Sequence, residues 1–299
     1  MASASSASGL RGLPGGSEIL VDSAWFAILS HAMTKRMGIG QFFAWDGGCL
    51  FIGHHDREVP VHAHQAMQLV VAREGNHRVR ANENEPWTTY AVAAIATRQT
   101  HSLDVTDSDY GAVIFVEPET REGRALAARF TNSGIIEVGN ESVREISRAM
   151  FDAWLQERRD ATVSQARHLV RTLTDGAEPT EVTDPRIMSA IVYINRNLDR
   201  AITLDEVASY ACLSPSRFRH VFAEQTGMGL RPYILWRRFM LAWELIMKGG
   251  NLSEVAHAAG FADAAHMSRT SVRAFGFAPS GIQLLSAPDP ERMLSDQSR

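Results

Sequence analysis

The sequence predicts an α+β fold, in which an N-terminal β-barrel with helices is followed by an all-α domain carrying a tandem helix-turn-helix. Three observations predict it. Short apolar runs separated by turn residues fill residues 41–118, a five-residue motif recurs in the second half, and the positive charge is concentrated there. A change from short strands to helical periodicity along one chain is typical of α+β proteins.

Residues 41–118 have the pattern of β-structure. Apolar runs such as Met67–Ala72 and Ala112–Val116 alternate with turn signals such as Gly47-Gly48 and Asp107-Ser108-Asp109. Many short strands at this spacing indicate a sandwich or a barrel.

A histidine motif lies inside this β region. His62, His64, Gln68 and Gly75 form the pattern H-x-H-x3-Q-x6-G, and His101 follows beyond the next strands. This resembles the first motif of cupin barrels, with glutamine where metal-binding cupins place glutamate. Alternation puts His62, His64 and Gln68 on one side of the strand path, facing the barrel interior.

We predict that these side chains bind a small polar effector. The four candidate ligand-binding residues are His62, His64, Gln68 and His101. No metal and no cofactor are expected, because neutral histidines and an amide offset none of the charge of a divalent ion. Two alternatives stay open, a zinc, iron or nickel ion on three imidazoles and a carbonyl, or histidines with a purely structural role. His54 and His55 lie outside the motif and are interpreted as surface or turn residues.

Residues 119–175 have helical periodicity. An apolar stripe runs along the predicted helix 144–155, formed by Ile146, Met150, Phe151 and Trp154. The stripe can pack on the barrel or on a second subunit, and the sequence alone does not separate these.

The second half of the chain contains the same sequence motif twice. Leu204-Asp205-Glu206-Val207-Ala208 recurs as Leu252-Ser253-Glu254-Val255-Ala256, 48 residues further on. Each copy continues through a turn of small residues into a second helix, which ends at Gly227 in the first copy and at Gly276 in the second. A short helix, a tight turn and a second helix with exposed polar residues form the helix-turn-helix of DNA-binding proteins.

The second helix of each copy supplies the candidate DNA contacts. Ser214 and Asp263 are the expected N-caps of these two helices. The outward residues, which reach base edges and phosphates in a major groove, are Ser216, Arg217, Arg219 and His220 in the first copy and Ala264, Ala265, His266, Arg269 and Arg273 in the second. One long helix over 233–247 is expected to hold the two recognition helices about one DNA turn, roughly 34 Å, apart.

Residues 187–282 resemble the DNA-binding domain of the AraC/XylS family of bacterial transcription regulators. The matching elements are Ile194, Leu204-Asp205-Glu206-Val207-Ala208, Leu213-Ser214, Phe218, Val221-Phe222, Thr226-Gly227, Tyr233, Arg238, Ala242, Val255-Ala256, Gly260-Phe261, Ser268-Arg269, Phe275-Gly276 and Pro279-Ser280. The resemblance implies a cupin-like sensor barrel, and dimerisation through the helical region 119–175.

Composition and charge agree with two globular domains. The 299 residues are 45% hydrophobic and 21% charged, and the net charge is −4. From residue 186 onward there are 13 Lys or Arg against 10 Asp or Glu, so the C-terminal part has a net positive charge and is the part expected to bind DNA phosphates. Cys49 and Cys212 show no paired or metal-binding spacing, which fits a reducing cytoplasm.

These observations predict the following domains: a disordered tail at 1–16, a cupin-like effector-binding and dimerisation domain at 17–175, a linker at 176–185, an AraC-type DNA-binding domain at 186–285 and a flexible tail at 286–299. No signal peptide and no membrane span are expected.

The expected function is ligand-responsive, sequence-specific regulation of transcription, without enzymatic activity. Expected partners are double-stranded operator DNA, RNA polymerase, a small-molecule effector and a second copy of the chain, in the bacterial cytoplasm and without a membrane. Two alternatives stay open, a cupin-type metalloenzyme with a helical appendage, and a constitutive DNA-binding regulator whose barrel only dimerises.

Overall fold

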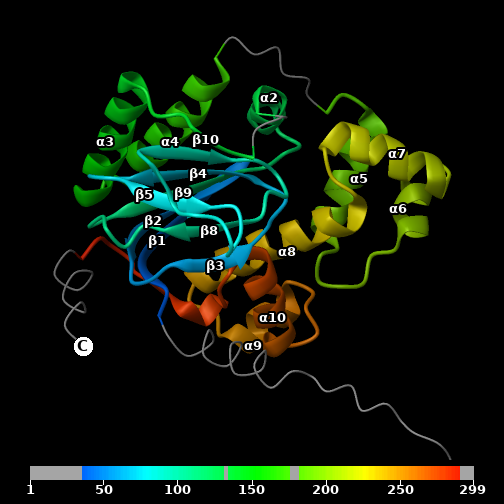
Figure 1. Ribbon diagram of the computed structural model, residues 1–299. Helices are drawn as coiled ribbons and strands as arrows, with labels where there is room; N and C mark the ends of the chain where they lie inside the picture. Colours follow the sequence, from blue (N-terminus) through cyan, green and yellow to red (C-terminus); the bar gives the residue numbers. More distant parts are fainter. Residues whose placement is uncertain (1–35, 131–133, 176–181, 290–299) are drawn as a thin grey trace, which may run out of the picture.

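The computed structural model describes residues 36–130, 134–175 and 182–289 (Figure 1). The predicted tail at 1–16 lies outside these residues, as do 176–181 of the predicted linker and 290–299 of the predicted C-terminal tail. The elements confirm the α+β fold class, with a sheet-rich part followed by a helical part. The domain boundaries themselves stay a prediction.

Two sheets form the N-terminal part. The seven-stranded sheet has the order β10-β7-β4-β9-β2-β1-β11, and the four-stranded sheet has the order β3-β8-β5-β6. The strands are β1 (Gly38–Trp45), β2 (Gly48–His55), β3 (Val59–His62), β4 (Met67–Ala72), β5 (His77–Arg80), β6 (Thr88–Tyr90), β7 (Val92–Ile95), β8 (His101–Asp104), β9 (Gly111–Val116), β10 (Ile135–Glu137) and β11 (Ile282–Leu284).

Helices cover the outer face of the larger sheet. They are α2 (Arg121–Arg129), α3 (Glu141–Leu155) and α4 (Arg159–Thr174) (Figure 1). Leu69 and Val71 of β4 point into this layer, whereas Val70 points between the two sheets, as the two-residue period of a strand requires. The apolar stripe of α3 belongs to the same layer, and Trp154 donates its indole N–H to Gln41 Oε1 of β1 at 2.7 Å. Of the two interpretations of this stripe, packing on the barrel is therefore the one observed.

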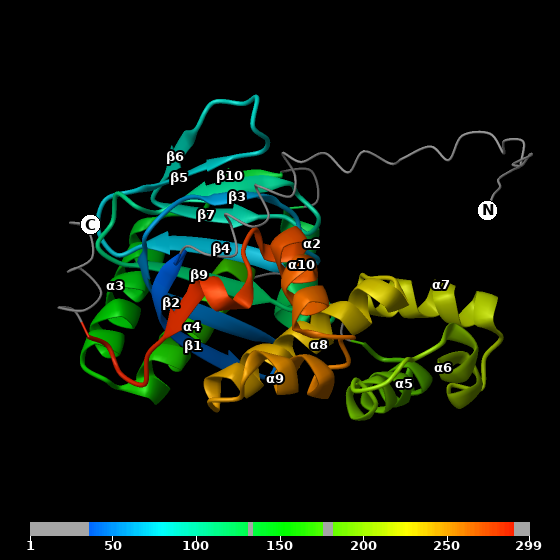
Figure 2. The same cartoon turned by 90° about the horizontal axis from the view of Figure 1, so that it is seen from below.

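The C-terminal part consists of two helix-turn-helix modules and a connecting helix. The first module is α5 (Pro185–Arg196), α6 (Leu204–Tyr210) and α7 (Pro215–Thr226), the connecting helix is α8 (Leu230–Met247), and the second module is α9 (Leu252–Ala258) and α10 (Ala264–Phe275). A short 3₁₀ helix, η1 (Pro279–Gly281), follows. Figure 2 shows the first module standing away from the sheets, while α10 lies against them.

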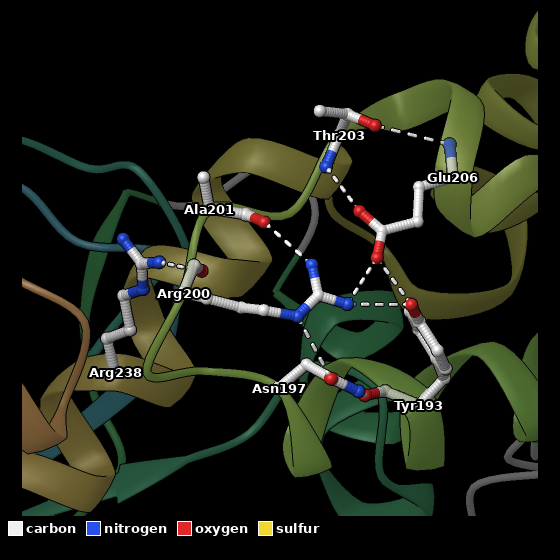
Figure 3. Close-up of polar contacts among 7 residues, drawn as sticks. All are labelled: Tyr193, Asn197, Arg200, Ala201, Thr203, Glu206 and Arg238. Carbon is white, nitrogen blue, oxygen red and sulfur yellow. Dashed lines mark hydrogen bonds and ion pairs between the residues drawn. The ribbon is translucent and has the colours of Figure 1, made fainter.

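A polar network fixes the start of α6 and joins it to α5 (Figure 3). Thr203 and Glu206 form a capping box, in which each side chain accepts a hydrogen bond from the backbone N–H of the other residue. The Arg200 guanidinium donates to the Glu206 carboxylate and to Tyr193 Oη. The remaining members of the network are Asn197, Ala201 and Arg238. Arg238 lies on α8 and donates to the carbonyl oxygen of Arg200 at 2.7 Å, so the same network ties the first module to the connecting helix.

The chain returns to the larger sheet after the second module. β11 pairs in parallel with β1, with Gly38 opposite Ile282 and Gly40 opposite Leu284. The backbone N–H of Met37 donates to the carbonyl oxygen of Gly281 at 2.7 Å. The second module is thus joined to the barrel both by the packing of α10 and by this strand.

Candidate functional site

The outer face of α7 carries the predicted DNA contacts of the first module. Its sequence favours a helix here because Ser214 accepts a hydrogen bond from the backbone N–H of Arg217 at 3.3 Å and Pro215 occupies the first turn. Phe218, Val221 and Phe222 are buried. Ser216, Arg217, Arg219 and His220 are all exposed. The two arginines make no ion pair with any described residue, so both guanidinium groups are free to bind bases or phosphates.

The outer face of α10 is less polar. Ala265, His266, Arg269 and Arg273 are exposed and Ala264 is half-buried. Asp263 caps the helix by accepting a hydrogen bond from the His266 backbone N–H at 2.6 Å, and this bond lowers the pKa of Asp263. Since His266 Nδ1 also accepts from the Ala262 N–H at 3.3 Å, the His266 ring is partly used within the module.

The barrel brings the four predicted effector-site residues together. His62 ends β3 and lies opposite His101 of β8 in the strand register, and Gln68 on β4 shares the inward face with Val70. The ring centroid of His62 is 4.2 Å from that of His101 and 5.6 Å from that of His64. All four side chains are buried. We call His62, His64 and His101 the histidine cluster.

Each ring of the histidine cluster is oriented by a backbone carbonyl close to it in sequence. The Nδ1 atoms of His62, His64 and His101 lie 2.8, 3.0 and 2.9 Å from the carbonyl oxygens of residues 60, 66 and 99, respectively. His64 Nε2 lies 2.6 Å from Gln68 Oε1. His101 Nε2 is buried without a hydrogen-bond partner among the described residues.

Burial keeps these rings neutral. It lowers the pKa of His62 to about 3 and the pKa of His64 to about 4, and it lowers the pKa of His101 well below its ordinary value. The mutual repulsion of charged rings adds to the effect at His62 and His101. At neutral pH the histidine cluster therefore presents three uncharged imidazoles.

The C-terminal end of α10 closes one side of the histidine cluster. The Phe275 ring is stacked on His64 with the ring centroids 6.3 Å apart, and it contacts Phe115 of β9 at 5.8 Å. A Cβ atom placed on Gly276 would lie 3.2 Å from His62 Nδ1. The predicted sensor site and the second recognition helix are therefore in direct contact.

A buried ion pair, which the sequence does not predict, forms a second contact between the two parts. Glu117, directly after β9, accepts a hydrogen bond from Arg237 Nη1 of α8 at 2.6 Å, and the Trp236 indole N–H lies 3.4 Å from the same carboxylate. Burial raises the pKa of Glu117, and the Arg237 charge opposes that rise. The sequence does not predict this ion pair, because a single glutamate before a proline and a single arginine on a long helix are common in exposed positions.

A cavity of about 640 Å³ lies beside this ion pair, between β1, β2 and α8. Its walls include Phe42 and Trp45 from the sheet, Arg159 from α4, and Met240 and Met247 from α8. No pattern in the sequence indicates this cavity.

Three further histidines of the barrel are buried. His54 and His55 lie in β2 with exposed fractions of 3% and 6%, so their interpretation as surface or turn residues was wrong. Neighbouring residues of a strand point to opposite faces of the sheet, and each ring is covered by a different contact: His54 Nδ1 lies 2.9 Å from the carbonyl oxygen of Asp109, and the His55 ring packs edge-on against Phe51. His77 in β5 is fully buried, and neither of its ring nitrogens has a hydrogen-bond partner among the described residues.

Comparison with known proteins places the C-terminal part in a family. Residues 207–283 match the family described as a helix-turn-helix domain. The probable transcriptional regulator LumQ of Photobacterium leiognathi is 34% identical over 92 residues, which cover 30% of this chain and 37% of LumQ. The HTH-type transcriptional regulator GbdR of Pseudomonas aeruginosa is 26% identical over 164 residues, which cover 50% of this chain and 42% of GbdR. The chain thus spans less than half the length of either relative.

A solved structure has a similar fold over most of the chain. An apo variant of ToxT from Vibrio cholerae superposes with a TM-score of 0.52 at 12% identity, over 78% of this chain and 96% of ToxT. At this identity the likeness concerns the fold. None of the described helices is long and apolar enough to cross a membrane.

Proposed function

Because this chain belongs to the AraC/XylS family of DNA-binding transcription regulators, we propose that it reads a specific operator through α7 and α10 and changes its DNA binding when an effector binds in the barrel. The observation that carries the proposal is the pair of capped helices, each with exposed arginines on its outer face.

Chemistry favours different roles for the two recognition helices. Arg217 and Arg219 can each donate two hydrogen bonds to a guanine, and Ser216 and His220 add further polar groups beside them. Ala264 and Ala265 offer only van der Waals contact, for example to a thymine methyl. We therefore propose that α7 defines the more informative half of the operator, whereas Arg269 and Arg273 of α10 bind mainly phosphates.

The test begins with selection of an operator from random DNA by the wild-type chain. Arg217→Ala or Arg219→Ala should then cost about 1–3 kcal/mol of specific binding, and less on random DNA, because only a base contact discriminates between sequences. Arg196→Ala serves as a matched control, since Arg196 is an exposed arginine of α5 and belongs to neither recognition helix. Equal losses on operator and random DNA for both variants would assign these arginines to phosphates, and stronger base preferences under α10 would reverse the proposed roles.

The effector site that we propose consists of His62, His64, Gln68 and His101. Its contact with Phe275 supports the proposal, because a change at the histidines reaches the end of α10 directly. The double change His62→Ala with His64→Ala should leave operator binding in place and abolish the response to the effector. A response that survives in this variant would move the effector elsewhere, and the cavity beside α8 would be the next candidate.

We further propose a homodimer that recruits RNA polymerase. The apolar stripe of α3 is used against the barrel, so the outer faces of α3 and α4 would meet the second copy. A non-enzymatic role is supported by the relatives, which are named as transcription regulators. Sedimentation of the chain with and without operator DNA tests the dimer.

A further inference from the structure

A second cavity lies between the turn that follows β4 and the first half of α3. Its volume is about 340 Å³, and three arginines line it, Arg73 from the turn and Arg144 and Arg148 from α3. Glu74 is its acidic lining residue. We call this cavity the basic pocket. Sites for small molecules have volumes of about 300–1,000 Å³, so the basic pocket has room for a small ligand.

The arginine charges of the basic pocket are poorly compensated by the protein. Arg148 approaches Glu141 at 3.7 Å, but these side chains are 59% and 69% exposed, so water screens the pair. Within the part of the chain that the structure describes, Arg73 and Arg144 make no ion pair. Arg144 and Arg148 are four residues apart on one helix, where like charges repel each other. The basic pocket therefore has an excess of positive charge.

Two of the lining side chains are held in place without a ligand. The Arg73 guanidinium lies over the Tyr110 ring, 5.8 Å from its centroid, and Tyr110 packs edge-on against Trp154 at 5.2 Å. On the opposite wall, Ser147 is buried in α3 and donates its hydroxyl hydrogen to the carbonyl oxygen of Val143 at 2.7 Å. Groups that are already ordered cost less entropy when a ligand binds to them.

The turn on the rim of the basic pocket leaves an entrance. Glu74, Gly75 and Asn76 are exposed and line the pocket. Gly75 has a left-handed backbone with φ of 75°, and a Cβ placed on it would meet no atom within 4 Å. A small molecule can therefore reach the arginines from this side.

Three arginines select an oxyanion as the ligand. The guanidinium group presents its donors in a planar fork, which binds a carboxylate or a phosphate through two parallel hydrogen bonds. An anion with two charges offsets more of the positive charge here than an anion with one. A phosphate monoester carries a charge of about −1.5 to −2 at pH 7, and a dicarboxylate carries two separate carboxylates. These two classes share the chemistry that the basic pocket recognises.

The basic pocket is separate from both sites described above. In Figure 1 and in Figure 2, α3 and α7 lie at opposite ends of the molecule. No residue of the histidine cluster lines the basic pocket. A DNA backbone is bound through an extended row of phosphate contacts, whereas the arginines here line one concave site.

We propose that the basic pocket binds one small dianionic oxyanion, a phosphate monoester or a dicarboxylate, through Arg73, Arg144 and Arg148. The inference goes beyond the proposed function, because it gives the barrel a second ligand site that does not involve the histidine cluster. A ligand there would join α3 to the turn that follows β4.

Binding is tested by isothermal titration calorimetry on the full chain at pH 8, with inorganic phosphate and with succinate as separate probes. One anion per chain is expected, and acetate, a monoanion, should bind at least about tenfold more weakly. Tighter binding of phosphate assigns the site to phosphate monoesters, and tighter binding of succinate assigns it to dicarboxylates. No saturation of the wild type by about 10 mM of either probe would overturn the inference.

Two variants locate the site. Arg144→Gln and Arg148→Gln should each weaken binding of the preferred probe about tenfold or more, because each removes a charge-assisted hydrogen bond. Arg158→Gln is the matched control, since Arg158 is an exposed arginine at the start of α4 that does not line the pocket. Glutamine is a good helix former, so all three variants should keep the far-ultraviolet circular dichroism of the wild type. Equal affinities of the pocket variants and the control would contradict the proposed site.

Competition separates a small anion from two larger occupants. Saturating random duplex DNA should leave the phosphate affinity unchanged, and displacement of the phosphate by DNA would assign the arginines to a nucleic-acid surface instead. Sedimentation of Arg144→Gln should match that of the wild type. A variant that loses self-association, together with a wild type that binds neither probe, would mean that a carboxylate of a second copy occupies the pocket. The double change His62→Ala with His64→Ala should bind phosphate like the wild type, whatever happens to its effector response.

Discussion

The two glycines that end the recognition helices provide a matched test of how firmly α10 is docked on the barrel. Gly227 and Gly276 both have left-handed backbones, with φ of 73° and 78°. An alanine at either position therefore has a similar intrinsic cost, about 1–2 kcal/mol. Their surroundings differ. A Cβ on Gly227 would approach Pro118 Cβ no closer than 3.7 Å, an ordinary contact.

A Cβ on Gly276 would overlap the barrel. It would lie 2.6 Å from Val59 Cγ1 and 2.9 Å from the carbonyl oxygen of Pro60, and the backbone atom cannot rotate away. Overpacking of this kind costs about 1–3 kcal/mol. We expect Gly276→Ala to lower the free energy of unfolding by about 2–5 kcal/mol in total, against about 1–2 kcal/mol for Gly227→Ala.

Urea unfolding of both variants, followed by tryptophan fluorescence, measures the difference. Hydrogen exchange locates it, since the amides of β11 should exchange faster in Gly276→Ala alone, as the docked end of α10 adjoins that strand. Equal losses of stability in the two variants would refute the reasoning, because they would mean that α10 does not press on Val59 and Pro60 in solution.

Three other outcomes are expected. Burial and the Glu117 charge raise the pKa of Glu119 from 4.5 to about 7, so the stability that its protonated form contributes is lost as the pH rises through that range. The amide of Glu119→Gln can still accept a hydrogen bond from the Tyr233 hydroxyl, but it does not ionise. The melting temperature of this variant should therefore change less between pH 5 and pH 8 than that of the wild type, and an equal pH dependence of the two would contradict this. Arg237→Ala leaves Glu117 buried without its partner and should cost about 3–5 kcal/mol in urea unfolding, largely recovered by adding Glu117→Gln; a loss below 1 kcal/mol would show the pair to be solvated. Thr203→Ala removes the capping box and should cost about 1 kcal/mol without changing operator affinity, and a large affinity change would connect that cap to DNA binding.

The local signals of the sequence predicted the helical part well. Caps and turns act over a few residues, so Ser214 and Asp263 marked the starts of α7 and α10 correctly. The expected long helix at 233–247 was also confirmed, with α8 beginning three residues earlier at Leu230. His62, His64 and Gln68 lie close together as expected, but strand alternation does not explain all three, because His64 lies in the connection between β3 and β4.

The contacts between the two parts were beyond the sequence. In the sequence, Phe275 is only an apolar residue at the end of a predicted helix, but in the structure its ring packs on His64, over two hundred residues earlier in the chain. Glu117 and Arg237 are likewise far apart in the chain, and each alone reads as a surface charge. The prediction that His54 and His55 lie at the surface was wrong for a related reason, since the local sequence around a polar strand residue does not show which other segments cover it. Such pairings depend on how the parts pack together, which periodicity does not encode.

The strand β11 has a consequence for exchanging DNA specificity between related chains. It supplies the hydrogen bonds along the free side of β1, with the Leu285 N–H also donating to the Gly40 carbonyl at 2.8 Å. A barrel produced without residues beyond 185 would expose that row of backbone donors and acceptors, and open sheet edges promote association between copies. A graft that replaces the helix-turn-helix modules should therefore keep residues 282–285 of this chain, because without them the sheet-rich part would expose the edge of β1 and would be expected to aggregate.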